Sequence, residues 1–305
     1  MSEDAERVDV HGRVFQRISL DDRIYFAPVA IDDREESRLT AQHELMCEIF
    51  GDRLFSPQIP VADPRAILEC GYGGGDWAVQ CAEEFEDCEV TAIDIFPMPV
   101  TDQPDNLELI GHNLNDPLRD PEVFQANRYD LIHSRFVFPG IKTARWARYI
   151  RDMKLLLRPG GWVQIMEYIP IIQSHSGRLT DESAVRRWWQ SYQAAMLRAD
   201  RDPRIGRRLG QLLLENRYRN VEVDVEQLHV GGWSPDPMKA SLGRQSVGMI
   251  GDLLESLGIW PFTAELGWTG AQFDHLMEEV RQELGNTDLK LYMEICIARG
   301  RKSTG

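Results

Sequence analysis

The middle of the chain alternates short apolar runs with longer stretches in which apolar residues recur at helical spacing. The short runs have the length and composition of buried strands, and the longer stretches are typical of amphipathic helices. Strands that alternate with helices predict an α/β fold with a parallel, doubly wound sheet. We expect strands at 66–69, 89–94, 107–111, 129–134 and 162–167, and helices at 76–85 and 145–157.

The flanking segments extend this pattern. Apolar residues at helical spacing predict a helix at 33–50, and a loop with several prolines separates it from the first strand. We expect further helices at 180–218, 238–257 and 270–284, and further strands at 221–229 and 289–298. The chain therefore divides into an N-terminal helical arm (1–64), a core (65–170), a helical capping insertion (171–220) and a C-terminal part of the core sheet with helices (221–305).

A glycine-rich loop with the sequence ECGYGGGDW (69–77) joins the first core strand to the first core helix. Glycines in such a loop allow positive φ angles and let the backbone approach a ligand closely. Asp94 ends the next strand, where a carboxylate suits the hydroxyl groups of a ribose. The loop and Asp94 together predict a nucleoside-containing ligand.

Three ligand classes and a ligand-free turn compete for this loop. The dinucleotide motif G-x-G-x-x-G has Asp76 at its last position, where a carboxylate at a helix start would repel a pyrophosphate. The phosphate loop G-x-x-x-x-G-K-[ST] has no match. An adenosyl ligand without phosphate fits, because Glu69 then faces an ammonium group rather than a phosphate. The fourth interpretation is a tight strand–helix turn that binds nothing.

Further polar residues are expected at the same edge of the sheet. Asn113 follows the third predicted strand, and His133, Ser134 and Arg135 end the fourth. Ligands of open parallel sheets bind outside the carboxyl ends of the strands. We therefore expect these groups near the ligand, with Asn113 where an adenine would lie.

These segments together resemble a class I S-adenosylmethionine-dependent methyltransferase over residues 66–168, in ILECGYGGGDWA, VTAIDIFP, IGHNLNDPL, YDLIHSRFV and LLLRPGGWVQIMEY. HGRVFQ (11–16), IYFAP (24–28), DREESRLTAQHEL (33–45) and VGGW (230–233) are similar to the fungal LaeA-like methyltransferases. That group includes regulators of secondary metabolism and tailoring enzymes of natural-product pathways. The resemblance implies a Rossmann-like sheet of seven strands with an antiparallel last strand, and S-adenosylmethionine as the cofactor.

The resemblance also implies which residues bind this cofactor. Glu69, Gly71, Gly73 and Gly75 would line its methionine side, Asp94 would bind the ribose, Ile95, Asn113 and Leu114 would contact the adenine, Ser134 and Arg135 would lie near the sulfur, and Tyr72 and Tyr25 complete the set. Tyr25 belongs to the N-terminal arm, which would fold over the cofactor; a simple strand edge is the alternative for it.

Methyl transfer is an in-line displacement for which the protein must align acceptor and methyl group and exclude water. An acceptor oxygen of high pKa also needs a base. Candidate bases are His133, His175, His229 and Glu167, and we select His133 and His229. A hydrogen-bonded structural imidazole is the alternative for each histidine. We expect no metal site.

Aromatic side chains in the predicted insertion allow two interpretations. Trp188, Trp189, Tyr192 and Met196 lie at helical spacing. They form either the packed face of a helix or a cap over an aromatic substrate.

The net charge, the apolar runs and the cysteines limit which partners and cell compartments we expect for the protein. A formal net charge of −15 argues against a nucleic-acid partner. No apolar run is long enough to cross a membrane, and the opening segment MSEDAERVDV has no apolar core behind a basic end, so we expect neither membrane attachment nor a secretory signal. Five cysteines without a CxxC pair predict reduced thiols in a cytoplasmic protein, with the nucleus as the alternative.

The predicted function is therefore methyl transfer from S-adenosylmethionine to oxygen, nitrogen or sulfur of a small secondary metabolite, and the acceptor could be aromatic. A LaeA-like regulator that works through protein partners is the first alternative. The second is a cofactor-binding fold that catalyses a rearrangement without methylation, since a fold does not determine its chemistry.

Overall fold

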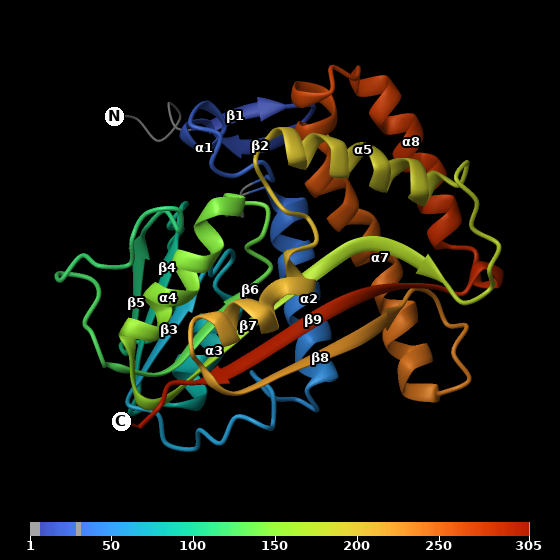
Figure 1. Ribbon diagram of the computed structural model, residues 1–305. Coiled ribbons are helices and arrows are strands. Elements are labelled where there is room, and N and C mark those ends of the chain that lie inside the picture. The colour runs from blue at the N-terminus through green and yellow to red at the C-terminus, as the bar shows by residue number, and fades with distance from the viewer. Residues whose placement is uncertain (1–6, 29–31, 305) are drawn as a thin grey trace. The chain divides into compact units, whose positions relative to one another are not determined.

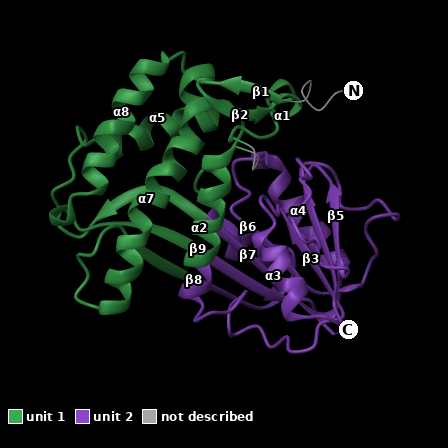
Figure 2. Ribbon diagram, turned by 180° about the vertical axis from the view of Figure 1, so that it is seen from behind, with its two compact units in different colours: residues 1–45, 168–204, 225–295 green, residues 46–167, 205–224, 296–305 purple. Residues whose placement is uncertain are grey.

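The computed structural model describes residues 7–28 and 32–304 (Figure 1). The opening segment that predicts no secretory signal lies partly outside these ranges. The chain forms two compact units (Figure 2): unit 1 comprises residues 1–45, 168–204 and 225–295, and unit 2 comprises residues 46–167, 205–224 and 296–305. The four-part division expected from the sequence stays a prediction.

Seven strands form one mixed sheet with the order β5-β4-β3-β6-β7-β9-β8. The neighbouring strands from β5 to β7 are parallel, and the last strand in the chain, β9, is antiparallel. This confirms the predicted Rossmann-like sheet. The strands are β3 (Ala66–Cys70), β4 (Glu89–Asp94), β5 (Leu107–Gly111), β6 (Tyr129–Arg135), β7 (Leu157–Ser174), β8 (Arg219–His229) and β9 (Leu291–Arg301).

Helices connect and accompany these strands, and most of them begin within two residues of the position expected from the sequence. They are α1 (Arg17–Asp21), α2 (Asp33–Ile49), α3 (Asp76–Glu84), α4 (Trp146–Leu156), α5 (Ala184–Arg198), α6 (Leu209–Glu215), α7 (Pro237–Trp260) and α8 (Gly270–Leu284), with short 3-10 or π turns η2 (Thr143–Arg145), η3 (Ile205–Arg208), η4 (Pro261–Glu265) and η5 (Thr287–Leu289). None of the helices described is long and apolar enough to cross a membrane.

The core of unit 2 lies around β3 and α3. All five residues of β3 are buried, as expected for a central strand of a parallel sheet. Trp77 in the first turn of α3 is fully buried among apolar side chains from β3, β4 and β6. Its indole Nε1 donates a hydrogen bond of 2.8 Å to the carbonyl of Leu54, so the polar atom of this large side chain is satisfied. This packing fixes the helix directly behind the glycine loop.

Unit 1 contains a helical core built from α5, η4, α7 and α8. Trp188 stacks on Tyr192 with ring centroids 4.8 Å apart, and both side chains are fully buried. Trp189 and Met196 are buried as well, so these four residues form the packed face of α5. Helix α8 begins with a capping box, in which Thr269 and Gln272 satisfy each other's backbone amides.

The structure differs from the sequence-based expectation at several element boundaries, and three differences are the largest. A hairpin of β1 (Arg7–Val10) and β2 (Arg13–Gln16) precedes the arm helix and was not expected. Strand β7 runs to Ser174 instead of ending at 167. The continuous helix expected over 180–218 is interrupted between α5 and α6.

The five cysteines, all within the described ranges, form no disulfide, and four of them are buried. Only Cys47 at the end of α2 is half-buried. Burial raises the pKa of both Cys70 and Cys88 to about 12, which keeps these thiols protonated.

Candidate functional site

The candidate site begins with the register of three neighbouring strands in unit 2. Glu69 in β3 lies opposite Ala92 in β4 and opposite His133 in β6. Side chains opposite each other in a sheet share a face, so Glu69 and His133 lie side by side. Both side chains are fully buried, and Glu69 Oε1 lies 3.8 Å from His133 Nδ1.

The glycine loop after β3 uses backbone conformations that favour glycine. Gly71 has φ = 82° and Gly75 has φ = 91°. A Cβ atom at Gly71 would come within 2.4 Å of Val137, and one at Gly75 would come within 2.4 Å of Val100. These two positions therefore need glycine for both conformation and space.

Asp94 at the end of β4 holds the glycine loop from one side. Its carboxylate accepts hydrogen bonds from the amide of Gly73 at 3.0 Å and from the amide of Phe96 at 2.9 Å. Burial raises the pKa of Asp94 to about 6, although these amide hydrogen bonds favour the charged form. Each carboxylate oxygen has a second lone pair, so Asp94 can still accept from a ligand hydroxyl.

Glu69 is the most unusual titratable group of the site. Neither of its carboxylate oxygens has a hydrogen-bond partner among the residues that the structure describes. Burial raises its pKa to about 8. The positive charge of Arg135 opposes this shift, whereas the carboxylates of Asp94 and Asp76 reinforce it. A buried carboxyl without hydrogen bonds is costly, which suggests that a ligand supplies its partner.

The residues next to Glu69 and His133 in the strands point to the opposite face. Cys70 and Ser134 lie opposite each other in β3 and β6, and both are fully buried. Ser134 Oγ lies 3.0 Å from the hydroxyl of Tyr149 in α4, so its hydrogen bond is made within the protein. Arg135, at the end of β6, is half-buried. Of the two residues expected near the cofactor's sulfur, Ser134 thus bonds to the α4 side of the sheet.

The remaining residues expected at the adenine follow β4 and β5. Ile95 is half-buried directly after Asp94. Asn113 is also half-buried, and its Oδ1 accepts hydrogen bonds of 3.0 Å from the backbone and side-chain amides of Asn115. The carbonyl of Leu114 accepts from Arg145 Nε at 3.0 Å. The turn that carries Asn113 and Leu114 is therefore ordered by the protein itself.

Tyr72, inside the glycine loop, is anchored away from solvent. Its hydroxyl donates a hydrogen bond of 3.0 Å to the carbonyl of Met98, and the side chain is 4% exposed. The side chain thus ties the glycine loop to the segment after β4, and the backbone of Tyr72 is the part that lies in the loop.

Glu167, a candidate base, holds the turn after β6 through two amide hydrogen bonds. Its carboxylate accepts hydrogen bonds from the amides of Val137 at 3.1 Å and Phe138 at 3.3 Å, and the side chain is fully buried. Phe136 just before has φ = 57°, an uncommon conformation for a bulky residue. Because Val137 packs on Gly71, Glu167 supports the glycine loop indirectly. The sequence pattern contained no signal for this role, nor for that of Trp77.

Two predicted site residues belong to unit 1. Tyr25 is half-buried in the segment after α1. His229 ends β8, where its ring stacks on Trp233 at 4.1 Å. Its Nδ1 has no hydrogen-bond partner among the residues described, and burial lowers its pKa. His175 stacks on Tyr292 at 4.5 Å in the same cluster.

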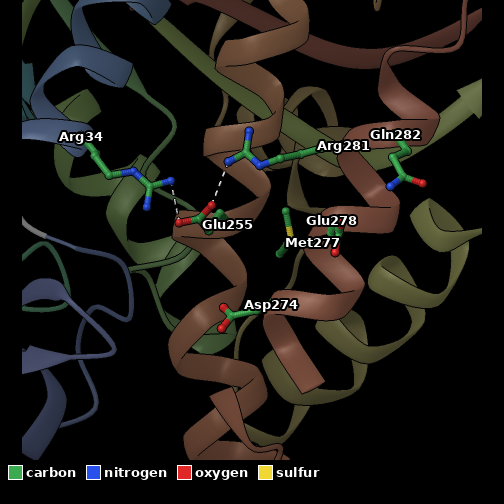
Figure 3. Close-up of a pocket in the computed structure, with 7 residues that line it drawn as sticks. All are labelled: Arg34, Glu255, Asp274, Met277, Glu278, Arg281 and Gln282. Carbon is green, nitrogen blue, oxygen red and sulfur yellow. Dashed lines mark hydrogen bonds and ion pairs between the residues drawn. The ribbon is translucent and has the colours of Figure 1, made fainter. Parts of the chain in front are cut away.

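A hollow of about 570 Å³ lies in unit 1 and is lined mainly by charged side chains (Figure 3). Glu255 accepts from Arg34 on one side and from Arg281 on the other. None of the site residues expected from the sequence lines this hollow. Within the described ranges, no group of three or more His, Cys, Asp or Glu side chains is placed to hold a metal ion.

Comparison of the sequence with known proteins finds a methyltransferase family model and several similar fungal proteins. Residues 41–222 match the family model described as a methyltransferase domain. The chain is similar to methyltransferase pytC of Aspergillus terreus, with 27% identity over 90% of this chain and 83% of that protein. It is similar to methyltransferase str3 of Strobilurus tenacellus, with 30% identity over 70% of this chain and 73% of that protein. The secondary metabolism regulator laeA of Monascus pilosus is 25% identical over 92% of this chain and 74% of its own length.

Proposed function

The chain belongs to the methyltransferase-domain family, and from this we propose that it transfers a methyl group from S-adenosylmethionine to a small-molecule acceptor of fungal secondary metabolism. The observation that carries the proposal is the buried carboxyl of Glu69, which has no hydrogen-bond partner among the described residues and precedes the glycine loop. An ammonium group is the partner that such a carboxylate lacks.

The residues of unit 2 fit this cofactor. When bound, S-adenosylmethionine supplies an electrophilic methyl group on a sulfonium. We propose that Glu69 pairs with its ammonium and that Asp94 accepts from its ribose hydroxyls. The glycine conformations at Gly71 and Gly75 keep the loop backbone free of side chains, and Asn113 with Leu114 borders the adenine. The positive charge of Arg135 favours the ionised form of Glu69.

We propose His229 as the base for an acceptor oxygen. Burial lowers its pKa, so the imidazole is neutral near pH 7, which is the form that accepts a proton. His229→Gln should lower kcat by about 10²-fold or more. A kcat within a few fold of the unaltered protein over the whole pH range would exclude this role.

Calorimetric titration with S-adenosylmethionine tests the cofactor assignment. The unaltered protein should bind, and Asp94→Ala should lose most of its affinity. Asp87→Ala is the matched control, because Asp87 is an exposed aspartate on the turn before β4. The proposal fails if the unaltered protein does not bind, or if the two variants bind equally well.

The similarity to laeA gives the regulatory alternative a specific basis. Incubation with cofactor labelled on its methyl group and a fungal metabolite extract separates the two functions. Label on a small molecule supports the proposed enzyme, whereas label confined to protein supports the regulator. We propose a cytoplasmic or nuclear location, since the cysteines of the described ranges form no disulfide.

A further inference from the structure

The buried neighbours of Glu69 contain a histidine that the proposed cofactor contacts do not use. His133 lies opposite Glu69 on the next strand, with Nδ1 3.8 Å from Glu69 Oε1. Both side chains have 0% exposure, so water cannot screen them from each other. The separation is longer than a hydrogen bond and short enough for a strong electrostatic interaction once Glu69 is charged.

The ring of His133 is held in place from its flat side. It stacks on the indole of Trp77 with centroids 4.0 Å apart and an angle of 13° between the planes. Trp77 is itself fixed by its hydrogen bond to the carbonyl of Leu54. An imidazole that is fully buried against an indole is poorly placed to take a proton from an acceptor, and its edge is directed at Glu69 instead.

We propose that His133 is a positioning residue that acts through Glu69, and this inference rests on the proposed cofactor. Below about pH 8, Glu69 keeps its proton in the free protein. When the ammonium of the cofactor binds, Glu69 releases this proton to solvent, and the neutral imidazole donates its Nδ1 hydrogen to Oε1. One carboxylate oxygen is thereby oriented by His133, and the other is available to the ammonium.

Three other charged groups near Glu69 also affect its pKa. Arg135 on β6 favours the ionised carboxylate, whereas Asp94 at the end of β4 and Asp76 at the start of α3 disfavour it. A hydrogen bond to the ionised carboxylate should lower its pKa by about one pH unit or more. Removing the imidazole should therefore raise the pKa of Glu69 further.

The test is the affinity for S-adenosylmethionine, measured by calorimetry between pH 6 and pH 9.5. In the unaltered protein the affinity should rise with pH and level off near the pKa of Glu69. In His133→Phe, which keeps an aromatic ring on Trp77, it should level off about one pH unit higher, so that the affinity near pH 7 falls about tenfold. The cofactor's own titration is common to all variants and cancels in the comparison.

Two further variants separate this role from a structural one. His133→Asn keeps a side-chain N–H donor and should restore the pH midpoint. Trp77→Phe removes the indole and its hydrogen bond to Leu54 but keeps the imidazole of His133, so it should weaken binding equally at every pH. An unchanged midpoint in His133→Phe, or a shift of the same size in Trp77→Phe, would overturn the inference. Absence of binding by the unaltered protein at every pH would instead overturn the proposed cofactor.

Discussion

At the scale of single residues, the site depends on carboxyl groups whose surroundings oppose their charge. Glu69 is buried without a hydrogen bond in the described structure, whereas Asp94 receives two amide hydrogen bonds. The two acids therefore differ in the cost of ionisation, and Glu69 has the higher pKa, about 8 against about 6. Such a group destabilises the free protein and is stabilised by a cationic ligand.

We predict that Glu69→Gln makes the free protein more stable in alkali than the unaltered protein. The pKa of Glu69 rises on folding from an ordinary 4.5 to about 8, so its contribution to stability is complete below pH 4.5 and is lost as the pH rises through 8. Gln has no such loss. Thermal unfolding from pH 5 to pH 9.5 should show similar melting temperatures near pH 5 and an advantage of the variant that grows up to about pH 8 and then levels off.

The same variant should bind S-adenosylmethionine more weakly, because an amide cannot neutralise the ammonium. Greater stability and weaker binding in one variant distinguish a ligand-directed carboxyl from a structural one. Melting temperatures that decline in parallel in the two proteins would contradict the pKa argument.

At the scale of elements, the loop between β3 and α3 is held from several sides. Val137 packs on Gly71, and Glu167 holds the amide of Val137. The carboxylate of Asp94 holds the amide of Gly73. The loop is thus ordered before any ligand binds, which lowers the entropy that binding must overcome.

We predict that Gly71→Ala destabilises the protein by about 1–3 kcal/mol through its positive φ, with an additional cost from the contact with Val137. Val137→Ala should remove the cost of the steric contact and leave the cost of the positive φ. The unfolding free energies of the two changes should therefore be non-additive in a double-mutant cycle measured by urea unfolding. Gly12→Ala is the control, since Gly12 has φ = 75° and no atom within 4 Å of its Cβ position. Additive free energies would exclude the contact with Val137.

At the scale of the whole molecule, the two units differ in what lies at their centres. Unit 2 has an apolar core around β3 and α3, and unit 1 has a buried cluster of ion pairs around Arg13. In unit 1, Arg13 of β2 is 2% exposed and donates to Asp32 at 2.8 Å, and to Glu35 and Glu255 at 3.4 Å. One guanidinium thus links the hairpin to α2 and α7. A large part of the acidic excess of the chain remains outside such buried pairs, on exposed side chains.

We predict that Arg13→Ala costs about 3–5 kcal/mol of unfolding free energy, because it leaves the buried carboxylate of Asp32 without its ion-pair partner and removes the hydrogen bonds to Glu35 and Glu255. Arg187→Ala removes an ion pair of 2.6 Å with Glu279 in the same unit, but both of those side chains are more than a third exposed. Its cost should be about 0–1 kcal/mol. The unfolding free energies of the two variants can be compared by denaturant unfolding, followed by circular dichroism. Equal losses in the two variants would contradict the role assigned to Arg13.

The sequence alone predicts the order of strands and helices and the glycine loop, because these follow from local periodicity and from turn residues. It does not predict that β7 begins at Leu157 and continues to Ser174, since Pro159 and Pro170 lie within that strand and proline normally interrupts a ladder. The sequence alone also does not predict that Glu69 and His133 lie side by side. Strand register brings these residues together, and periodicity contains no information about register.

The four buried thiols can be used to measure how often parts of the fold open transiently. A thiol-reactive reagent needs both access and a thiolate, and Cys70, Cys81, Cys88 and Cys296 lack access in the folded state. We expect one rapid modification at Cys47 and four slow ones whose rates follow the opening of β3, α3, the turn before β4, and β9. Mass spectrometry over time would read these rates, and S-adenosylmethionine should slow the modification of Cys70, which adjoins Glu69, more than that of Cys296.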